Sequence, residues 1–169
     1  MVKYKAMKVP DIFNGEVLES LITGEFVQNE LSLGITEEKF YEIYGQPTEK
    51  VKNALKSFQD IVIYFYGNQY EEQASYFALW FEGDKQDKRK KYKLRTVEFV
   101  FPHVSEFTVK KMKLLLGEPD LEYFSGYQMH YCYGNVIFMF TKIRNRWDLT
   151  NIRYQDDDYK NEHRTLFDK

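Results

Sequence analysis

The chain has 169 residues, of which 43% are hydrophobic and 30% are charged, and its formal net charge is -2. This composition is typical of a globular protein, and the length fits one domain or two small halves that share a core. The near-neutral charge gives no overall attraction to nucleic acid or to anionic membranes, so we expect no nucleic-acid partner. Aromatic residues make up 18% of the chain. This content favours β-sheet and is also typical of protein-binding surfaces.

The cysteine content and the apolar runs indicate the cellular compartment. The single cysteine, Cys132, excludes an internal disulfide and is compatible with a reducing environment. No apolar run approaches the roughly 20 residues of a transmembrane helix. Residues 1–10 contain no apolar signal-peptide core. We therefore expect a cytoplasmic protein, and the alternative is an exported or envelope-associated bacterial module whose signal segment is absent from this sequence.

Residues 1–30 are predicted to form an N-terminal helix with a lead-in segment. Four apolar residues fall on one face of a helix over residues 16–23, which Gly24 ends. The following apolar and polar residues partly alternate over residues 26–33, which predicts a short strand.

One segment of the chain occurs twice, at residues 36–47 and again at residues 108–119. Each copy begins with threonine, continues as a short amphipathic segment and closes with Gly-x-Pro. Threonine is a good helix N-cap, glycine allows the left-handed turn after a helix, and proline prevents its continuation. Each copy therefore predicts a helix of about nine residues, which is too short to be stable alone and must pack on a sheet.

Three further blocks follow each helix in the same order. They pair residues 64–67 with 131–134, residues 77–81 with 136–140, and residues 94–99 with 149–154. We therefore predict two tandem repeats with one shared sheet, in a single domain. The first repeat covers residues 31–102, the second covers residues 103–154, and a charged tail follows over residues 155–169.

Six runs of β-branched and aromatic residues are predicted strands. They cover residues 60–66, 75–81, 92–101, 123–133, 135–141 and 147–154, with a tight hairpin at Gly134 and Asn135. Each repeat is then a short helix, a Gly-x-Pro turn and a three-stranded antiparallel meander. The predicted fold class is α+β, with the helices on one face of a six- to eight-stranded antiparallel sheet.

Four tyrosines are candidates for a partner-binding surface. They are Tyr64 and Tyr66 in the first repeat, and Tyr131 and Tyr133 in the second. Because alternate residues of a strand point to the same face, each pair shares one face. If the residues between them face the helices, the tyrosines and Trp80 line the open face of the sheet and bind a partner. The alternative is that the tyrosines are only half-buried sheet residues.

A basic loop has no counterpart in the second repeat. Its cations are candidates for electrostatic contact with a partner and include Lys88, Arg89, Lys90 and Lys91. A solvated hairpin tip is the simpler interpretation, and contact with an anion or an acidic partner is the alternative.

We predict no catalytic residue, metal site or cofactor. His103, His130 and His163 lack a second ligand at metal-binding spacing on the same element. Cys132 shares a strand face with His130, which we expect to be the core, so the thiol is predicted to be buried and inert. The sequence also contains no phosphate-binding loop. These observations favour a binding protein over an enzyme.

The duplicated unit resembles the β-lactamase-inhibitor-protein-like architecture. The resemblance is carried by residues 33–36 leading to residues 44–47, and by residues 116–120, and it covers about residues 31–154. The group includes small bacterial outer-membrane assembly lipoproteins and secreted proteins of Gram-positive bacteria. The resemblance implies that the chain binds other proteins, as the inhibitor does with its concave sheet and aromatic residues. This chain has neither the lipidated N-terminal cysteine of the lipoproteins nor the disulfides of the inhibitor, so the resemblance implies a binding mode and no target.

Taken together, these features predict a non-enzymatic protein-binding module. We expect an inhibitor or immunity-type protein that covers a toxin or an enzyme with the aromatic-rich face of its sheet. The second alternative is a small-molecule binder or an enzyme, with a pocket between the repeats that tyrosines and His130 line.

Overall fold

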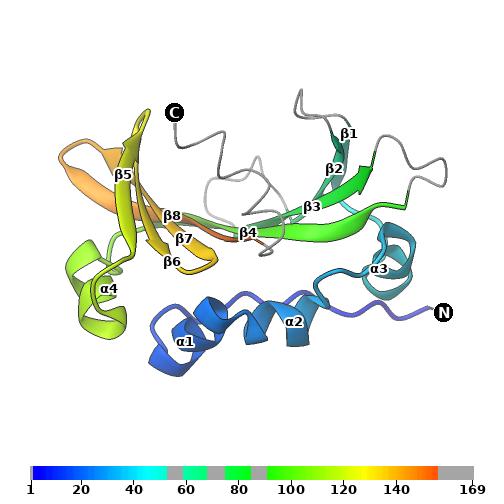
Figure 1. Ribbon diagram of the computed structural model, residues 1–169, viewed down its shortest axis with the longest axis horizontal. Helices are drawn as coiled ribbons and strands as arrows, with labels where there is room; N and C mark the ends of the chain where they lie inside the picture. The colour runs from blue at the N-terminus through cyan, green and yellow to red at the C-terminus, as the bar shows by residue number, and fades with distance from the viewer. Residues whose placement is uncertain (1, 53–58, 68–74, 85–90, 156–169) are drawn as a thin grey trace.

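The computed structural model describes residues 2–52, 59–67, 75–84 and 91–155. Within these ranges the chain forms four helices and eight strands (Figure 1). The helices are α1 (Gly15–Thr23), α2 (Glu25–Leu31), α3 (Glu37–Tyr44) and α4 (Val109–Leu116). The strands are β1 (Glu49–Lys52), β2 (Gln59–Tyr66), β3 (Tyr76–Asp84), β4 (Lys93–Val104), β5 (Leu121–Ser125), β6 (Gln128–Tyr133), β7 (Val136–Ile143) and β8 (Arg146–Gln155).

The strands form one antiparallel sheet in the order β1-β2-β3-β4-β8-β7-β6-β5. The first four and the last four strands are each a meander, and the two meanders join where β4 pairs with β8. β1 and β5 are therefore the two edges of the sheet. The predicted α+β class and the predicted antiparallel sheet are confirmed.

Two details of the predicted strands are wrong. β1 was not predicted, and residues 123–133 are not one strand, because the chain turns between β5 and β6. Gly126, in this turn, has a φ of 62°, which glycine adopts at little cost. Aromatic residues occur on both sides of this turn, so the composition of the segment did not reveal where one strand ends and the next begins. Each half of the sheet therefore has four strands.

The N-terminal region contains two helices in place of the predicted helix and strand. α1 begins where the Asn14 side chain accepts the N–H of Glu16 at 3.0 Å, and it ends at Gly24, as predicted. The predicted strand over residues 26–33 is wrong, because most of it lies in the helix α2. Gly24, with a φ of 83°, ends α1 and lets the chain turn directly into α2. The apolar residues of α2 then become buried on one side of the helix.

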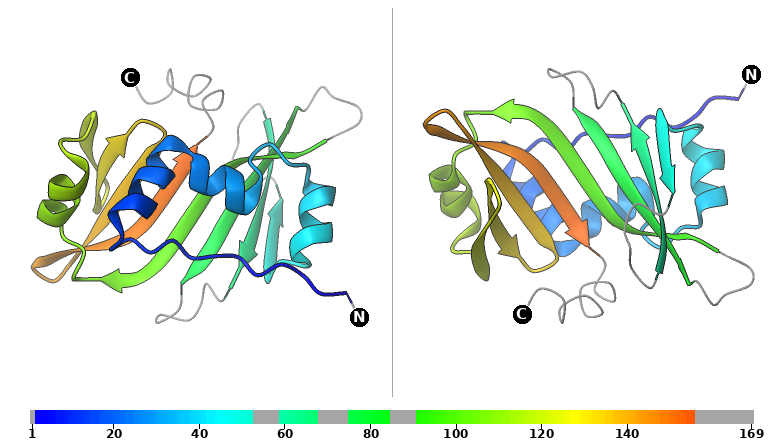
Figure 2. Two further views of the ribbon diagram at one scale, coloured as in Figure 1. Left: turned by 90° about the horizontal axis from the view of Figure 1, so that it is seen from below. Right: turned by 90° about the horizontal axis from the view of Figure 1, so that it is seen from above.

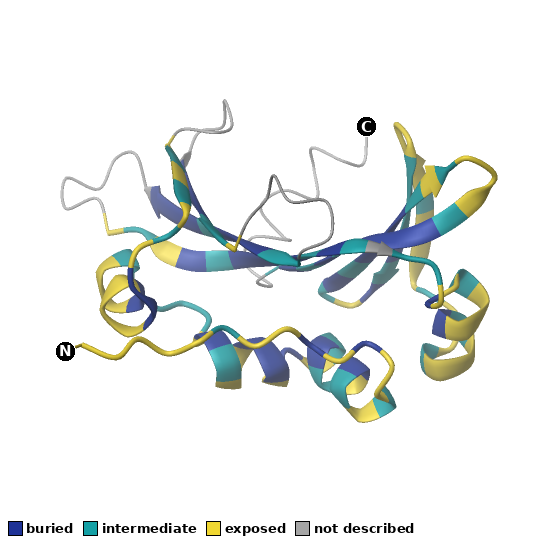
Figure 3. Ribbon diagram, turned by 180° about the vertical axis from the view of Figure 1, so that it is seen from behind, coloured by how far each residue is buried: buried dark blue, intermediate teal, exposed yellow. Residues whose placement is uncertain are grey.

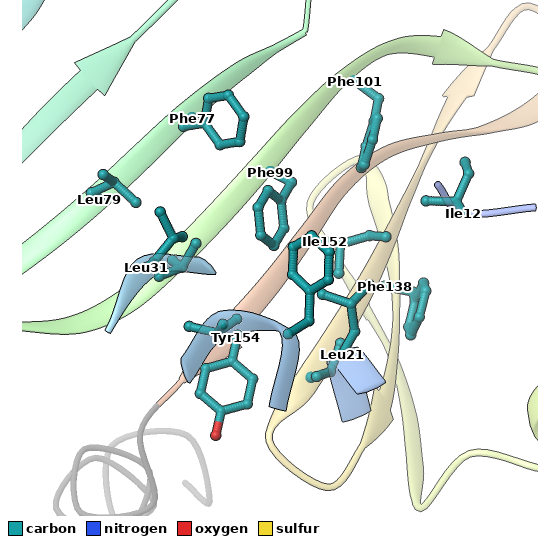
Figure 4. Close-up of a cluster of buried hydrophobic side chains, with 14 of the residues drawn as sticks. Ile12, Leu21, Leu31, Phe77, Leu79, Phe99, Phe101, Phe138, Ile152 and Tyr154 are labelled. Atoms are coloured by element: carbon teal, nitrogen blue, oxygen red, sulfur yellow. The ribbon is translucent and has the colours of Figure 1, made fainter. Parts of the chain in front are cut away.

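The main hydrophobic core lies between the helices and one face of the sheet. Residues from all four helices and from both halves of the sheet share this core, including Leu21, Val27, Phe40, Met112 and Phe138. Figure 4 shows helix residues of α1 and α2 beside side chains of β4 and β8. Figure 2 shows α1 and α2 crossing the middle of the sheet, with α3 and α4 toward its two ends. Figures 1 and 2 show no described helix on the opposite side of the sheet, and we call that side the helix-free face.

The sheet is curved. In Figures 1 and 3 its two ends rise toward the helix-free face, so that this face is concave. Curvature of this kind follows from the twist of antiparallel strands. A concave surface can surround a convex segment of a partner.

The described helices are short. The longest of them, α1, has nine residues, and none in the described part of the chain has the length and apolar character needed to cross a membrane.

The helices α3 and α4 begin and end in the same way. The Thr36 hydroxyl accepts the N–H of Lys39 at 3.4 Å, and the Thr108 hydroxyl accepts the N–H of Lys111 at 3.1 Å. Both helices end at the glycine of Gly-x-Pro, with φ values of 79° and 81°. Both predicted helices are therefore confirmed.

Candidate functional site

The four candidate tyrosines point toward the helices, and their predicted position on the open face is wrong. They are Tyr64, Tyr66, Tyr131 and Tyr133, and all four pack in or against the helix-side core. Two of their hydroxyls bind at helix ends: Tyr66 donates to the carbonyl of Gly45 and Tyr133 donates to the carbonyl of Gly117, each at 2.8 Å. A carbonyl at a helix C-terminus has no partner within its helix. Tyr66 and Tyr133 therefore combine an apolar ring packed on the core with a hydrogen bond that caps a helix end.

Burial raises the pKa of these four tyrosines above the ordinary value of about 10, at which they are already protonated at neutral pH. It is the largest cause of a raised pKa at each of the four and raises the pKa of Tyr133 to about 12. The Tyr64 hydroxyl donates to the Glu37 carboxylate, which raises the pKa of Tyr64 further. All four hydroxyls can therefore act as donors in the folded protein. Their placement favours a structural role.

The other candidate residues are placed differently. Trp80 packs against Ile61, Ile63 and Ala78, which form a small cluster on the helix-free face. Lys91 of the basic loop is exposed, whereas Lys88, Arg89 and Lys90 lie outside the described residues. Of the five predicted partner-binding residues, only Trp80 is on the helix-free face.

Arg153 forms the centre of a polar cluster on this face. Its guanidinium lies 4.8 Å from the centroid of the Trp80 ring, and its Nη2 lies 3.3 Å from Oε2 of Glu98. Asn151 Nδ2 donates to the other Glu98 oxygen at 2.9 Å. Glu98 and Arg153 are directly opposite each other where β4 pairs with β8. The cluster therefore holds the junction between the two halves of the sheet.

Hydrogen bonds continue from this cluster toward the β5 edge. Gln128 Nε2 donates to Asn151 Oδ1 at 3.4 Å and to Thr141 Oγ1 at 3.1 Å. His130 Nε2 lies 3.4 Å from Gln128 Oε1, and His130 Nδ1 lies 2.9 Å from the Tyr123 hydroxyl. We call this chain of side chains the polar network. Its members are Trp80, Glu98, Tyr123, Gln128, His130, Thr141, Asn151 and Arg153.

The polar network fixes the protonation of His130. Because the Gln128 amide nitrogen donates to Asn151 and Thr141, its oxygen faces the imidazole and accepts from Nε2–H. Nδ1 is then free of hydrogen and accepts from the Tyr123 hydroxyl. Burial and, to a smaller extent, the Arg153 charge lower the pKa of His130. The imidazole is therefore neutral at neutral pH.

We expect the pKa of His130 to lie below 6.5, the ordinary value for histidine. Arg153→Gln removes the second cause of the lowering and should raise this pKa. Because the unfolded chain takes up the proton first, stability should decrease as the pH falls below about 6.5. An NMR titration of the His130 ring measures the pKa directly. A pKa at or above 6.5 in the folded wild-type protein would contradict this assignment. As a control, His130→Gln should remove the part of the pH dependence of stability that His130 causes.

Cys132 is half-buried on the helix-free face, so its predicted position in the core is wrong. It shares this face with His130, whose two ring nitrogens are both engaged by the polar network. The imidazole is therefore not available as a base for the thiol. The described residues contain no group of three or more metal-ligating side chains. The side chain of His103 and all of His163 lie outside the described part.

Two buried polar atoms beside the polar network have no hydrogen-bond partner in the described part of the chain. They are Arg153 Nε and Thr96 Oγ1. Thr96 is opposite Trp80 in the pairing of β3 with β4, so both atoms lie close to the ring that stacks on Arg153. Buried polar groups are normally satisfied. The hydrogen bonding of this cluster is therefore incomplete among the described residues.

A groove of about 460 Å³ lies between α3 and β2, and its lining is mostly acidic. The lining residues are Glu37, Glu38, Tyr41, Glu42 and Tyr64. Lys50 Nζ lies 2.7 Å from the Glu37 carboxylate and neutralises part of this charge. The groove lies within the first half of the chain and differs from the predicted pocket between the repeats.

Sequence reasoning missed most of the polar network. Glu98, Asn151 and Arg153 come together only because β4 pairs with β8, and more than 50 residues separate Glu98 from the other two. The available signal was the presence of polar residues at alternate positions of otherwise apolar strands, opposite to the core positions. Residue type alone does not distinguish such positions from solvated ones.

No protein-family model matches the sequence, and no curated protein sequence matches it. The chain does match solved structures, among them the following three. A DUF4309 family protein (YjgB) from Bacillus subtilis subsp. subtilis str. 168 is 14% identical with a TM-score of 0.46, and the match covers 81% of this chain and 92% of that chain.

The other two structures come from larger proteins. A cysteine-rich secretory protein (SAV1118) from Staphylococcus aureus subsp. aureus Mu50 is 10% identical, with a TM-score of 0.39 and coverage of 76% and 46% of the two chains. An extracellular protein containing a SCP domain from Bacillus anthracis str. Ames is 14% identical, with a TM-score of 0.39 and coverage of 97% and 53%. The present chain spans about half the length of each of these two proteins.

Proposed function

We propose that this chain is a non-enzymatic protein-binding module, an inhibitor or immunity-type protein that covers a toxin or an enzyme with its helix-free face. The polar network is the observation that carries the proposal. It places Trp80, Tyr123 and Arg153 on a concave surface, and tryptophan, tyrosine and arginine are the residue types enriched at protein interfaces.

The side chains of the network are held in place before a partner binds. Arg153 is fixed by the Trp80 ring and by Glu98, and Tyr123 is fixed by His130. Side chains that are already ordered lose less conformational entropy on binding. These features support recognition of a folded partner through a few central side chains.

We also propose that the two halves are tandem repeats with their helices on one face of the sheet. The β4–β8 junction supports this, since an offset of 55 residues relates Val97 to Ile152 and Phe99 to Tyr154. In the sheet, Val97 is opposite Tyr154 and Phe99 is opposite Ile152, as a two-fold relation requires. The same offset relates Glu98 to Arg153, so the centre of the polar network lies at the two-fold position.

A duplicated unit explains why the binding side chains lie at the junction. Neither repeat alone contains the pair of Glu98 and Arg153, because each repeat supplies one of them. The arrangement also agrees with the resemblance to the β-lactamase-inhibitor-protein-like architecture, in which the concave sheet binds the partner. We propose the same binding mode here, with a different set of residues.

Affinity capture from lysate of the native host tests the proposed function. We expect the wild-type protein to retain one stoichiometric partner, and we expect Trp80→Ala or Arg153→Ala to lose it. The matched control is Tyr41→Ala, an exposed aromatic residue of α3 on the other side of the molecule. Each variant is first shown to be folded by circular dichroism.

Two results would contradict the proposal. One is a partner that the Trp80 and Arg153 variants retain as well as the wild type does. The other is the absence of any stoichiometric partner for the folded wild-type protein.

A further inference from the structure

The two edges of the sheet have opposite chemical character although they occupy equivalent positions. The N–H of Thr48, before β1, donates to Phe65 O at 2.7 Å, and the N–H of Asp120, before β5, donates to Cys132 O at 2.8 Å. Counting from these contacts, Glu49 of β1 corresponds to Leu121 of β5, and Lys52 of β1 corresponds to Phe124 of β5. At both positions β1 has a charged side chain and β5 has an apolar one.

β1 carries the charges that normally protect an edge strand from pairing with another chain. β5 lacks this protection. Leu121 is 57% exposed and Phe124 is 61% exposed, and Tyr127 in the adjoining turn is 69% exposed. Among the described strands only β6 pairs with β5, so the outer edge of β5 has no described strand beside it. Figure 1 shows β5 at one end of the sheet, raised toward the helix-free side.

We propose that β5 pairs with β5 of a second copy of this chain, in an antiparallel dimer that joins the two sheets. All five residues of β5 are paired when the two-fold axis of the dimer passes through Tyr123, perpendicular to the sheet. Tyr123 then lies opposite Tyr123 of the second copy, Leu121 lies opposite Ser125, and Glu122 lies opposite Phe124. Each pair has its side chains on the same face of the joined sheet.

The charges of β5 suit a second copy. In this register no two carboxylates face each other across the junction, because Glu122 faces an apolar ring. Lys113 Nζ already lies 3.4 Å from the Glu122 carboxylate and 3.3 Å from the Glu118 carboxylate. Like charges directly opposite each other would destabilise an antiparallel pair. A neutralised, apolar edge therefore favours pairing with itself.

The molecule already contains a junction of this kind. At its centre, β4 and β8 pair antiparallel and keep the helices of both halves on the same side. Pairing of β5 with its own copy repeats this geometry at the outer edge. A second copy is therefore compatible with the curvature and the helix placement of the sheet.

Sedimentation equilibrium of the full chain tests the dimer. We expect a twofold increase in apparent mass with rising concentration. The double variant Leu121→Glu/Phe124→Lys places the charges of β1 on β5 and should remain a monomer at every concentration. The control is Leu114→Lys, which changes the most exposed leucine of α4 and should leave the dimer unchanged. A wild-type protein that stays monomeric at every concentration would overturn the proposal. In that case the β5 edge would be available to pair with a strand of another protein.

Cysteine cross-linking tests the register independently of protein stability. In a Cys132→Ser background, Tyr123→Cys places two thiols directly opposite each other, and mild oxidation should give a disulfide-linked dimer. Leu121→Cys is the matched control, because its opposite residue is Ser125. Equal linkage at both positions, or linkage at neither, would contradict the register. These experiments concern the β5 edge, so their outcome is independent of whether the helix-free face binds a partner.

Discussion

Replacing Phe40 with alanine is expected to lower the free energy of unfolding by about 3–5 kcal/mol. Phe40 is fully buried and lies at the centre of the helix-side core of the first half. Its ring centroid lies 4.4 Å from that of Tyr44, 5.3 Å from that of Phe81 and 5.8 Å from that of Tyr66. Alanine would leave a cavity that three aromatic rings cannot fill by small movements. The loss should appear as a lower denaturant midpoint in chemical unfolding.

The neighbouring residue supplies the control for this prediction. Tyr41 is 38% exposed, and Tyr41→Ala should change the free energy of unfolding by about 0.5 kcal/mol or less. If both variants lost the same stability, or if Phe40→Ala lost no more than the control, Phe40 would not be the centre of the core. Met112 occupies the corresponding position in α4 and is also fully buried, so Met112→Ala should behave as Phe40→Ala does, with a loss of about 2–5 kcal/mol.

Replacing Gly117 with alanine is expected to cost about 1–3 kcal/mol through backbone strain alone. Gly117 has a φ of 81° and a ψ of -166°, a region that residues with a side chain rarely adopt. A Cβ at this position would meet no atom within 4 Å, so no steric contact adds to the cost. Thermal or chemical unfolding measures the loss.

Gly45 gives the matched experiment in the first half. Its φ of 79° and ψ of -164° are nearly the same, but a Cβ there would lie 2.9 Å from the Tyr4 ring. Tyr4 is 49% exposed and can move aside, so Gly45→Ala should cost only slightly more than Gly117→Ala. Gly15→Ala, at the first residue of α1, is the control and should be neutral or stabilising. A neutral result at Gly117 or Gly45 would show that the helix-ending glycines are not required by the backbone.

The sequence predicted the elements whose signals are local. The helices α1, α3 and α4 each have a polar N-cap or a terminating glycine within their own segment, and the hairpin at Gly134 lies between two strongly aromatic strands. α2 was misread because its few apolar residues fit both a short strand and a short helix. The turn that follows Gly24 decides between the two, and that turn depends on packing against the sheet.

The orientation of the sheet was misread for a different reason. We expected the residues between the paired tyrosines to face the helices, whereas the tyrosines do so, and Tyr66 and Tyr133 donate to the carbonyls of the glycines that end α3 and α4. The spacing between each Gly-x-Pro turn and the following Tyr-x-Tyr-Gly block was visible in both repeats, but the contact between them is tertiary. The candidate site shifted accordingly, from the tyrosine pairs to the polar network around Arg153.

The central claim is that the helix-free face contacts a protein partner. Hydroxyl-radical footprinting of the captured complex tests this directly, because it reports which side chains the partner covers. We predict that Trp80 and His130 become protected in the complex, whereas Tyr4 and Tyr41 are oxidised as in the free protein. Protection of Tyr4 and Tyr41 without protection of Trp80 would contradict the account and place the partner on the helix side of the molecule.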